Sequence, residues 1–294
     1  MRKSSFPRLF SVCYVPLLLL FTVYVLLDTF VIPQRYQAET PLETAAPAQA
    51  AVKTENSYTD GNISITLTQH RAFDTDIYVA EVTLSSPQPL KTALAQQTYG
   101  KNITDITSSI AKQAGAILAV NGDYYSARNG YVLKNGTLYR ESAARNQEDL
   151  CIDANGDFFI ISEQEISARS LLNQGVENLL SFGPALVKDG QISVDENEEV
   201  SSRSMLSNPR TALAQTGPMH YLFVVSDGRT DKSRGLSLYE LAEFLQSLGA
   251  QTAYNLDGGG SATMVFDGRV INNPTTNGRT IRERSVSDIV CIIP

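Results

Sequence analysis

The chain has 294 residues, of which 43% are apolar and 19% charged, a composition typical of a folded globular protein. Its 24 basic and 31 acidic residues give a formal net charge of −7, and the basic residues beyond the N-terminus form no dense cluster. This argues against nucleic acid as a partner, because nucleic-acid binding requires a basic face. The two histidines, His70 and His220, do not support a zinc site, and we expect both to be structural.

The N-terminal sequence predicts a membrane span. Arg2, Lys3 and Arg8 precede an uncharged stretch from Leu9 to Leu27, which as a helix would span roughly 28 Å, close to the thickness of a bilayer core. We predict a cytoplasmic tail at residues 1–8 and an uncleaved signal anchor in the lipid bilayer at residues 9–31. The C-terminal domain then lies outside the cell membrane. A cleaved signal peptide and a buried core helix are the alternatives.

The region after the span predicts a linker and then one folded domain. Residues 32–57 are rich in Ala, Pro, Thr and Glu without hydrophobic periodicity, as linkers are. We place the domain at residues 58–294, where Ile63, Ile65 and Leu67 alternate with polar residues as in a strand. Cys13 lies in the span. Cys151 and Cys291 are the pair that could form a disulfide, and two separate buried thiols are the alternative.

Periodicity and turn residues then predict the elements of this domain. Apolar residues at helical spacing predict a helix over 103–114, and a strand follows at 116–120. A second helix begins at Ser237, which forms a capping box with Glu240, and a strand follows at 252–256. Four turn dipeptides predict antiparallel hairpins: Asn135-Gly136, Asn155-Gly156, Asp189-Gly190 and Asp267-Gly268. We expect an α+β fold, a single domain with a largely antiparallel mixed sheet flanked by helices, preceded by one transmembrane helix.

Four short segments place polar residues at the ends of predicted strands. They are Asn121–Tyr125, Asn208–Thr211, Ser226–Arg229 and Asn255–Met264. The last contains three consecutive glycines beside Asp257, and glycine is used where the backbone must approach something closely. Strand ends of one sheet meet at one rim, so the four segments predict a single cleft.

Each segment also has a purely structural interpretation. Asp227-Gly228 and Asn121-Gly122-Asp123 are also typical of Asx turns. Glu240 has a place in the capping box, and Arg210 could be a surface charge whose stem packs on apolar atoms. It is the occurrence of all four segments at strand ends that favours a functional site.

The ordered motifs resemble those of the phosphodiester glycosidase family. They are Asn121–Tyr125, Phe182–Pro184, Pro209–Ala212, Val225–Arg229, Arg234–Ser237 with Glu240, Asn255–Ser261 and Glu283–Asp288. The resemblance covers residues 58–294. It implies hydrolysis of a sugar-1-phosphodiester, which here would belong to a phosphorylated glycan of the cell envelope or an exopolysaccharide, of the N-acetylglucosamine-1-phosphodiester type.

The resemblance and the chemistry of the reaction together assign candidate roles. Asp257 is the first candidate for general base or nucleophile at the sugar, and the other candidate carboxylates are Glu240, Asp227 and Asp123. Guanidinium groups suit the phosphate, and backbone N–H groups of the glycines suit an anion or close approach to the sugar. The candidate substrate-binding residues are Asn121, Arg210, Arg234, Asn255, Gly258, Gly259, Gly260, Ser261 and Arg284.

Other functions remain open. A noncatalytic protein that binds phosphoglycan during envelope or exopolysaccharide assembly would use the same cleft. A metal-dependent phosphodiesterase is less well supported, since such sites draw on several histidines. The sequence requires no cofactor, although clustered carboxylates could hold calcium or magnesium. It indicates neither metal ligands nor an oligomeric state.

Overall fold

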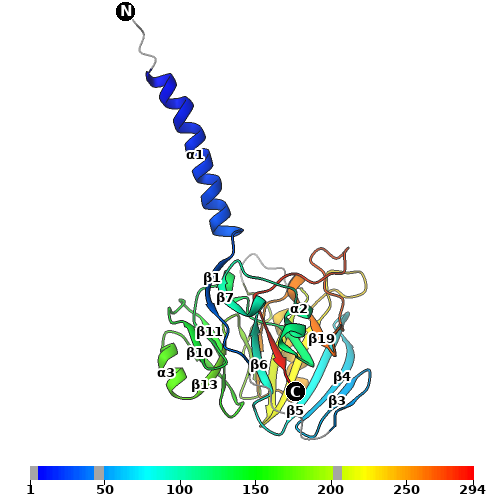
Figure 1. Cartoon of the computed structure of the whole chain (residues 1–294). Helices are drawn as coiled ribbons and strands as arrows, with labels where there is room; N and C mark the ends of the chain where they lie inside the picture. The colour runs from blue at the N-terminus through cyan, green and yellow to red at the C-terminus, as the bar shows by residue number, and fades with distance from the viewer. Residues whose placement is uncertain (1–5, 43–49, 201–206) are drawn as a thin grey trace, which may run out of the picture.

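The computed structural model describes residues 6–42, 50–200 and 207–294. It has one long N-terminal helix, α1 (Phe6–Phe30), which projects from a single folded domain, as Figure 1 shows. The predicted cytoplasmic tail lies partly outside the described residues, and its last three residues already belong to α1. Every pairing between the described strands is antiparallel, so the expected α+β class with largely antiparallel strands is confirmed.

The largest sheet has nine strands. In spatial order they are β15 (Gln191–Ile192), β14 (Ala185–Lys188), β18 (Thr252–Asn255), β16 (Thr211–Gly217), β17 (His220–Ser226), β5 (Thr75–Leu84), β4 (Ile63–Ala72), β3 (Ser57–Thr59) and β2 (Val52–Lys53). Its central strands are buried on both faces, and along β17 alternate side chains enter two different cores. This explains why β17 is continuously apolar, whereas the partly exposed β4 alternates.

A second sheet of five strands packs against the first. Its order is β20 (Arg269–Val270), β19 (Met264–Phe266), β8 (Leu118–Asn121), β21 (Asp288–Ile292) and β6 (Leu90–Leu94). The largest core lies between the two sheets, with Phe223 of β17 and Val290 of β21 among its members. Helix α4 (Leu238–Ser247) covers the outer face of the first sheet, and α2 (Thr107–Ala114) covers that of the second. The domain is therefore a four-layer sandwich of helix, sheet, sheet and helix.

Smaller elements complete the domain. They are the sheet β12 (Phe158–Ser162), β11 (Glu148–Asp153) and β13 (Val176–Leu180), the hairpin β9 (Val132–Lys134) and β10 (Thr137–Arg140), helix α3 (Ala168–Asn173), and the single turns η1 (Ala95–Gln97), η2 (Tyr125–Ala127) and η3 (Gly259–Ser261). Each of the four turn dipeptides lies in an antiparallel hairpin, as predicted. Cys151 and Cys291 are both buried free thiols in separate cores, so they do not pair.

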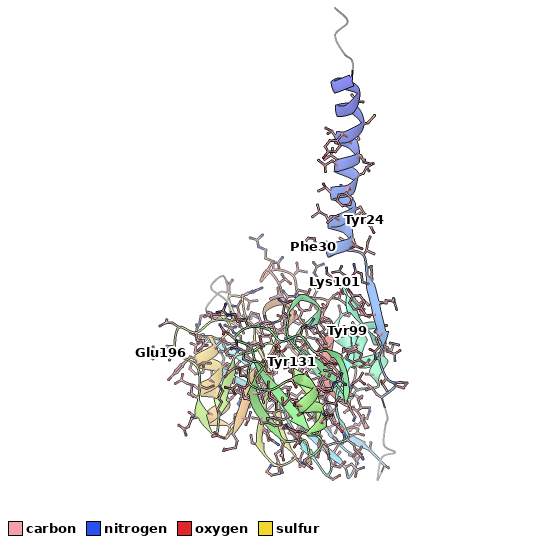
Figure 2. The ribbon with its side chains drawn as sticks, turned by 90° about the vertical axis from the view of Figure 1, so that its left-hand side faces the viewer. Tyr24, Phe30, Tyr99, Lys101, Tyr131 and Glu196 are labelled. Atoms are coloured by element: carbon pink, nitrogen blue, oxygen red, sulfur yellow. The ribbon has the colours of Figure 1, made fainter. Side chains whose placement is uncertain are left out.

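The segment predicted to be a linker contributes strands to the fold. Residues Gln34–Ala38 form β1, which pairs with β7 (Thr98–Lys101) directly below α1. In Figure 2, Lys101 and Tyr99 lie just beneath the end of α1 at Phe30. Further along, β2 joins the edge of the nine-stranded sheet through β3. The pairing of β1 explains why a segment without hydrophobic periodicity is ordered, since backbone hydrogen bonds hold it.

Ser237 and Glu240 form a capping box at the N-terminus of α4, as predicted from the sequence. Ser237 Oγ accepts a hydrogen bond from Glu240 N, and Glu240 Oε2 accepts one from Ser237 N. The Ser237→Ala variant should lower the free energy of unfolding by about 1 kcal/mol, because two backbone N–H groups lose their coordinated cap. Denaturant unfolding measures the change. Ser64→Ala, at an exposed strand position, is the control and should change it by less than about 0.5 kcal/mol. Equal effects would contradict the capping role.

Candidate functional site

Asp257 lies where the ends of the two large sheets meet. Its backbone N–H donates to Gly122 O at the end of β8 (3.3 Å), and its carbonyl accepts from Asn121 Nδ2 (2.6 Å). Asn121 Oδ1 in turn accepts from Thr211 Oγ1 of β16 (2.7 Å). Both ends of the Asn121 amide are therefore used inside the protein, and this buried residue positions Asp257 between the sheets.

The Asp257 side chain lines a hollow of about 390 Å³. Among the described residues that line it, three bring guanidinium groups and Asp257 brings the carboxylate. The lining residues are Phe182, Val200, Asn208, Arg210, Arg229, Leu256, Asp257, Gly258, Gly259 and Arg284. Arg284 pairs with Asp257 and Arg210 pairs with Glu199, so the three guanidinium groups leave a net positive charge at the hollow, which suits an anionic ligand although the whole chain has a net charge of −7.

Arg284 connects Asp257 to the glycine run. Its Nη2 donates to Asp257 Oδ2 (3.1 Å) and to Gly258 O (3.2 Å), and its Nε donates to Ser261 Oγ (2.8 Å). The Arg284 side chain is 40% exposed and that of Asp257 is 11% exposed, so the pair borders the opening. Ser261, a candidate substrate-binding residue, thus contacts this guanidinium.

Arg210 is held deeper in the wall. Its Nε donates to Leu236 O (2.9 Å), and its Nη2 lies 3.3 Å from both carboxylate oxygens of Glu199. Burial lowers the pKa of Arg210, and the Glu199 carboxylate partly offsets this effect. The sequence predicted Arg210 but not Glu199, which lies in a charged, turn-like stretch with no motif.

Arg229 is a third guanidinium that the sequence motifs did not single out. Its Nη2 donates to Asn208 Oδ1 (2.8 Å), its Nη1 donates to Thr276 O (2.7 Å), and its backbone has φ of 61°. Burial and then the like charge of Arg284 lower the pKa of Arg229. An anion between these two arginines would relieve their repulsion. Arg229 does lie in the segment Ser226–Arg229 that the sequence analysis identified, but Asp227 was taken as the functional residue of that segment.

The three glycines allow three backbone segments to approach one another. A Cβ on Gly258 would lie 2.7 Å from Pro209 O, and one on Gly260 would lie 2.2 Å from Thr276 Oγ1. Gly259 has φ of 61°, and its N–H donates to Pro209 O (2.8 Å). The glycine run therefore packs closely against the neighbouring segments at Pro209 and Thr276. The N–H group of Gly259 already has a hydrogen-bond acceptor within the protein.

The other predicted carboxylates lie outside the hollow. Asp227 accepts from Asn273 N and Nδ2 (both 2.8 Å) and so holds the loop after β20. Glu240 caps α4 and pairs with Arg234 (2.6 Å), which takes Arg234 out of the site as well. Asn255 is buried, and its Nδ2 donates to Gly183 O (2.8 Å). These residues build the walls and do not line the opening.

A buried charge cluster lies behind the hollow. Lys134 Nζ is 3.0 Å from Asp123 Oδ2 and 2.9 Å from Asp288 Oδ2, and all three side chains have no exposed surface. Burial opposes ionisation of Asp123, but the charge of Lys134 and the hydrogen bonds from Ser181 N, Lys134 and Asp288 together outweigh it and lower the pKa of Asp123. Burial and the charge of Asp123 raise the pKa of Asp288 to about 7, against the effect of Lys134. Asp123 is therefore a structural ion with no access to the opening.

A second buried acidic group joins this cluster through Ser181. The Ser181 N–H donates to Asp123 Oδ2 (2.9 Å), and its Oγ contacts Asp149 Oδ1 (2.7 Å) and Glu163 Oε1 (3.1 Å). Burial and the neighbouring Glu163 carboxylate raise the pKa of Asp149 to about 9. Asp149 is therefore protonated at neutral pH. Since Phe182 follows Ser181 and lines the hollow, both clusters support the same wall.

Metal ligation was left open by the sequence. Within residues 6–42, 50–200 and 207–294, no group of three or more His, Cys, Asp or Glu side chains is arranged to hold a metal ion. The candidate carboxylates Asp257, Asp227, Glu240 and Asp123 each contact protein partners.

Comparison with known proteins identifies a family that this chain resembles. A family model described as phosphodiester glycosidase matches residues 114–293, more than half of the chain. The chain is 32% identical over 199 residues to mouse N-acetylglucosamine-1-phosphodiester alpha-N-acetylglucosaminidase, covering 62% of this chain and 38% of the mouse protein. It is 26% identical over 200 residues to the SPbeta prophage-derived uncharacterized protein YomE of Bacillus subtilis (strain 168), covering 66% of this chain and 30% of that protein. The chain thus spans less than half the length of either relative.

Solved structures share the fold. The catalytic domain of zebrafish N-acetylglucosamine-1-phosphodiester alpha-N-acetylglucosaminidase, auto-inhibited by its pro-peptide, is similar with a TM-score of 0.63 and 19% identity over 90% of this chain and 89% of that chain. A hypothetical protein from Synechocystis gives a TM-score of 0.56 and 16% identity over 79% of this chain and 62% of that chain. At these identities the likeness concerns the fold alone.

Removing the charge of Lys134 should strongly destabilise the domain. Lys134→Ala leaves two buried carboxylates without their cation, which should cost about 3–5 kcal/mol in the free energy of unfolding. The control is Lys188→Ala, which breaks the exposed pair with Glu148 and should cost less than about 1 kcal/mol. Denaturant unfolding of both variants measures the difference, and similar values for the two would rule out a structural role for the cluster.

The buried Asp149 predicts that the stability of the domain falls as the pH rises. The pKa of Asp149 in the folded protein, about 9, lies far above the pKa of an aspartate in the unfolded chain. At pH values between these two pKa values, unfolding therefore releases a proton. The free energy of unfolding should therefore fall as the pH rises from about 5 to about 9. Asp149→Asn should flatten this slope, whereas the exposed Asp74→Asn should leave it unchanged. Unfolding curves at several pH values test this, and an unchanged slope in Asp149→Asn would refute it.

Proposed function

Since the chain belongs to the phosphodiester glycosidase family, we propose that it hydrolyses a sugar-1-phosphodiester at the hollow that contains Asp257. The observation that carries the proposal is that one carboxylate, Asp257, and three guanidinium groups, Arg210, Arg229 and Arg284, line the same hollow. A phosphodiester needs positive charge around the phosphate, and the sugar carbon needs negative charge beside it. This arrangement supplies both within one hollow.

The arginines would hold the phosphate. Arg229 and Arg284 lie close enough for their like charges to interact, and a bridging phosphate would neutralise this repulsion. Arg210 is the more rigid member, because Leu236 O and Glu199 fix its plane. Guanidinium groups bind phosphate oxygens in pairs, which also fixes the orientation of the substrate.

Asp257 would act at the anomeric carbon. As the bond between C1 and the phosphate oxygen breaks, positive charge develops on the sugar ring, and the carboxylate stabilises it. The oxygen of water ends on C1, and the released phosphate monoester takes up negative charge beside the arginines. Phosphate is a good leaving group, so the reaction needs less acid assistance than an ordinary glycoside. This agrees with the position of Glu240, Asp227 and Asp123 outside the hollow.

We place the domain outside the cell membrane, with α1 as its anchor. Val12–Phe30 is long and apolar enough to span a bilayer, and none of it is buried against the domain. A core helix would be covered, so this alternative is not supported. The basic residues before the span favour a cytoplasmic N-terminus. The substrate in this proposal is a phosphorylated glycan of the envelope.

The catalytic role of Asp257 is tested with the full chain in detergent and an N-acetylglucosamine-1-phosphodiester, the compound class in the name of the mouse relative. Asp257→Ala should lower the rate of sugar release by about 10²–10⁴-fold, since the carboxylate at the reacting carbon is lost. Asp267→Ala removes an exposed aspartate that pairs with Lys53 far from the hollow, and it should keep the rate of the unmodified chain.

Two outcomes would reject this proposal. Binding of phosphoglycans without sugar release would instead support a binding protein in envelope assembly. Hydrolysis in water enriched in oxygen-18 should place the label on the sugar. Label in the phosphate would show that the phosphorus-oxygen bond breaks, as in a phosphodiesterase.

A further inference from the structure

The hollow opens at the end of the domain to which α1 is attached. In the five-stranded sheet, Asn121 of β8 pairs with Ile289, and Asp288 of β21 pairs with Leu94 of β6, so these three strand ends lie together. Leu94 leads through η1 into β7, the strand that holds β1 below α1. Figure 1 shows the loop before β21 at this same end, near the base of α1. The register therefore places the site and the base of α1 at one end of the sandwich.

The connection between α1 and the domain is short and held by hydrogen bonds. Three residues, Val31–Pro33, separate the end of α1 from the start of β1, and they reach at most about 10 Å. Asn102 Nδ2 donates to Thr29 O (3.2 Å) and Ile32 O (3.1 Å) at this junction. Glu39, just after β1, accepts from Leu94 N with both carboxylate oxygens (3.1 Å). The site end thus stays close to the surface of any bilayer that α1 spans.

The loop beside the hollow has the chemistry of a membrane-contacting loop. Ile281 is 53% exposed and is flanked in sequence by the exposed residues Arg279 and Arg282. Neither arginine forms an ion pair with an acidic residue of the described part of the chain. The backbone is fixed by the bridge from Thr275 to Ile281 and by Arg282 N donating to Pro274 O (2.8 Å). An apolar side chain between cations suits the boundary between lipid headgroups and acyl chains.

This loop is joined directly to the site. Thr276 O accepts from Arg229 Nη1, and Arg284, which pairs with Asp257, lies two residues after Arg282. A bilayer contact at Ile281 would therefore bring the phosphate-binding arginines to the headgroup level. A substrate dissolved in bulk water would gain nothing from this arrangement, whereas a substrate held in the bilayer would.

We propose that the substrate is a membrane-borne sugar-1-phosphodiester, in which the sugar-1-phosphate is esterified to a lipid alcohol. This inference rests on the proposed hydrolysis at Asp257 and adds where the substrate resides. The oxygen of water forms the new bond to C1, the bond from C1 to the phosphate oxygen breaks, and one proton is released. The free sugar leaves into water, and the phosphate monoester stays on the lipid in the bilayer.

The experiment compares two substrates with the same sugar and phosphate. The full chain is reconstituted into vesicles of phosphatidylcholine and phosphatidylglycerol, with either a long-chain alkyl diester in the bilayer or a methyl diester in solution. In one variant, about 12 Gly and Ser residues inserted between Phe30 and Val31 add roughly 20 Å of reach. In a second variant, Ile281→Asp introduces a negative charge at the proposed contact. Released sugar is measured for each.

Both variants should cleave the bilayer substrate about tenfold more slowly than the unmodified chain, because the contact with the bilayer is weakened. They should cleave the methyl diester at the unmodified rate, which also shows that they fold. The matched control is Val270→Asp, since Val270 is 37% exposed, follows Arg269 and lies on edge strand β20, away from the junction with α1. It should leave both rates unchanged.

The outcomes separate this inference from the proposed function. Equal cleavage of the bilayer substrate by the unmodified chain and by both variants would overturn the membrane-borne substrate while leaving hydrolysis intact. Cleavage of the methyl diester without cleavage of the bilayer substrate would do the same. Failure to release sugar from either substrate would reject the hydrolysis itself, and the inference with it.

Discussion

The ammonium group of Lys134 lies between the carboxylates of Asp123 and Asp288 without any exposed surface. This cluster joins the hairpin that starts at β9 to the ends of β8 and β21. Next to Asp123, the carbonyl of Gly122 accepts a hydrogen bond from the backbone N–H of Asp257, which connects the cluster to the hollow. The Gly122 position has no room for a side chain, since a Cβ there would lie 2.4 Å from Asp288 Oδ2. A buried charge cluster of this kind contributes little net stability compared with apolar packing, but breaking it is costly. Its contribution is to fix the position of the strand ends that form the site.

Local chemistry explains what the sequence could predict. Asn135, Asp189 and Asp267 all have positive φ in their hairpins, as their turn dipeptides require, and the Ser237 capping box depends only on neighbouring residues. The division of the strands between two large sheets depends on pairings between distant segments, which periodicity does not encode. For the same reason β1 appeared to be linker, because its order comes from backbone pairing with β7.

The site shows the same division between local and distant information. The motifs named Asp257, Arg210 and Arg284, and all three side chains line the same hollow. They could not separate a carboxylate that lines the opening from one that holds a wall, since Asp257 and Asp227 occur in similar Asp-Gly contexts. Arg229 and Glu199 were missed because their contacts lie in other segments of the chain: Arg229 Nη1 donates to the backbone carbonyl of Thr276, and Glu199 accepts from Arg210 Nη2. The motifs thus indicated the region of the candidate site, and the contacts in the structure show which of the candidate residues line the hollow.

The three residues between α1 and β1 have a consequence for kinetics. In the membrane-anchored arrangement proposed above, the domain would meet a substrate in the same bilayer by lateral diffusion, so its effective substrate concentration would be a surface density. Diluting the surrounding solution leaves this density unchanged, whereas adding more lipid lowers it. In that proposed arrangement, the short segment Val31–Pro33 would make the amount of substrate per membrane area, and not per volume of solution, set the rate of substrate binding.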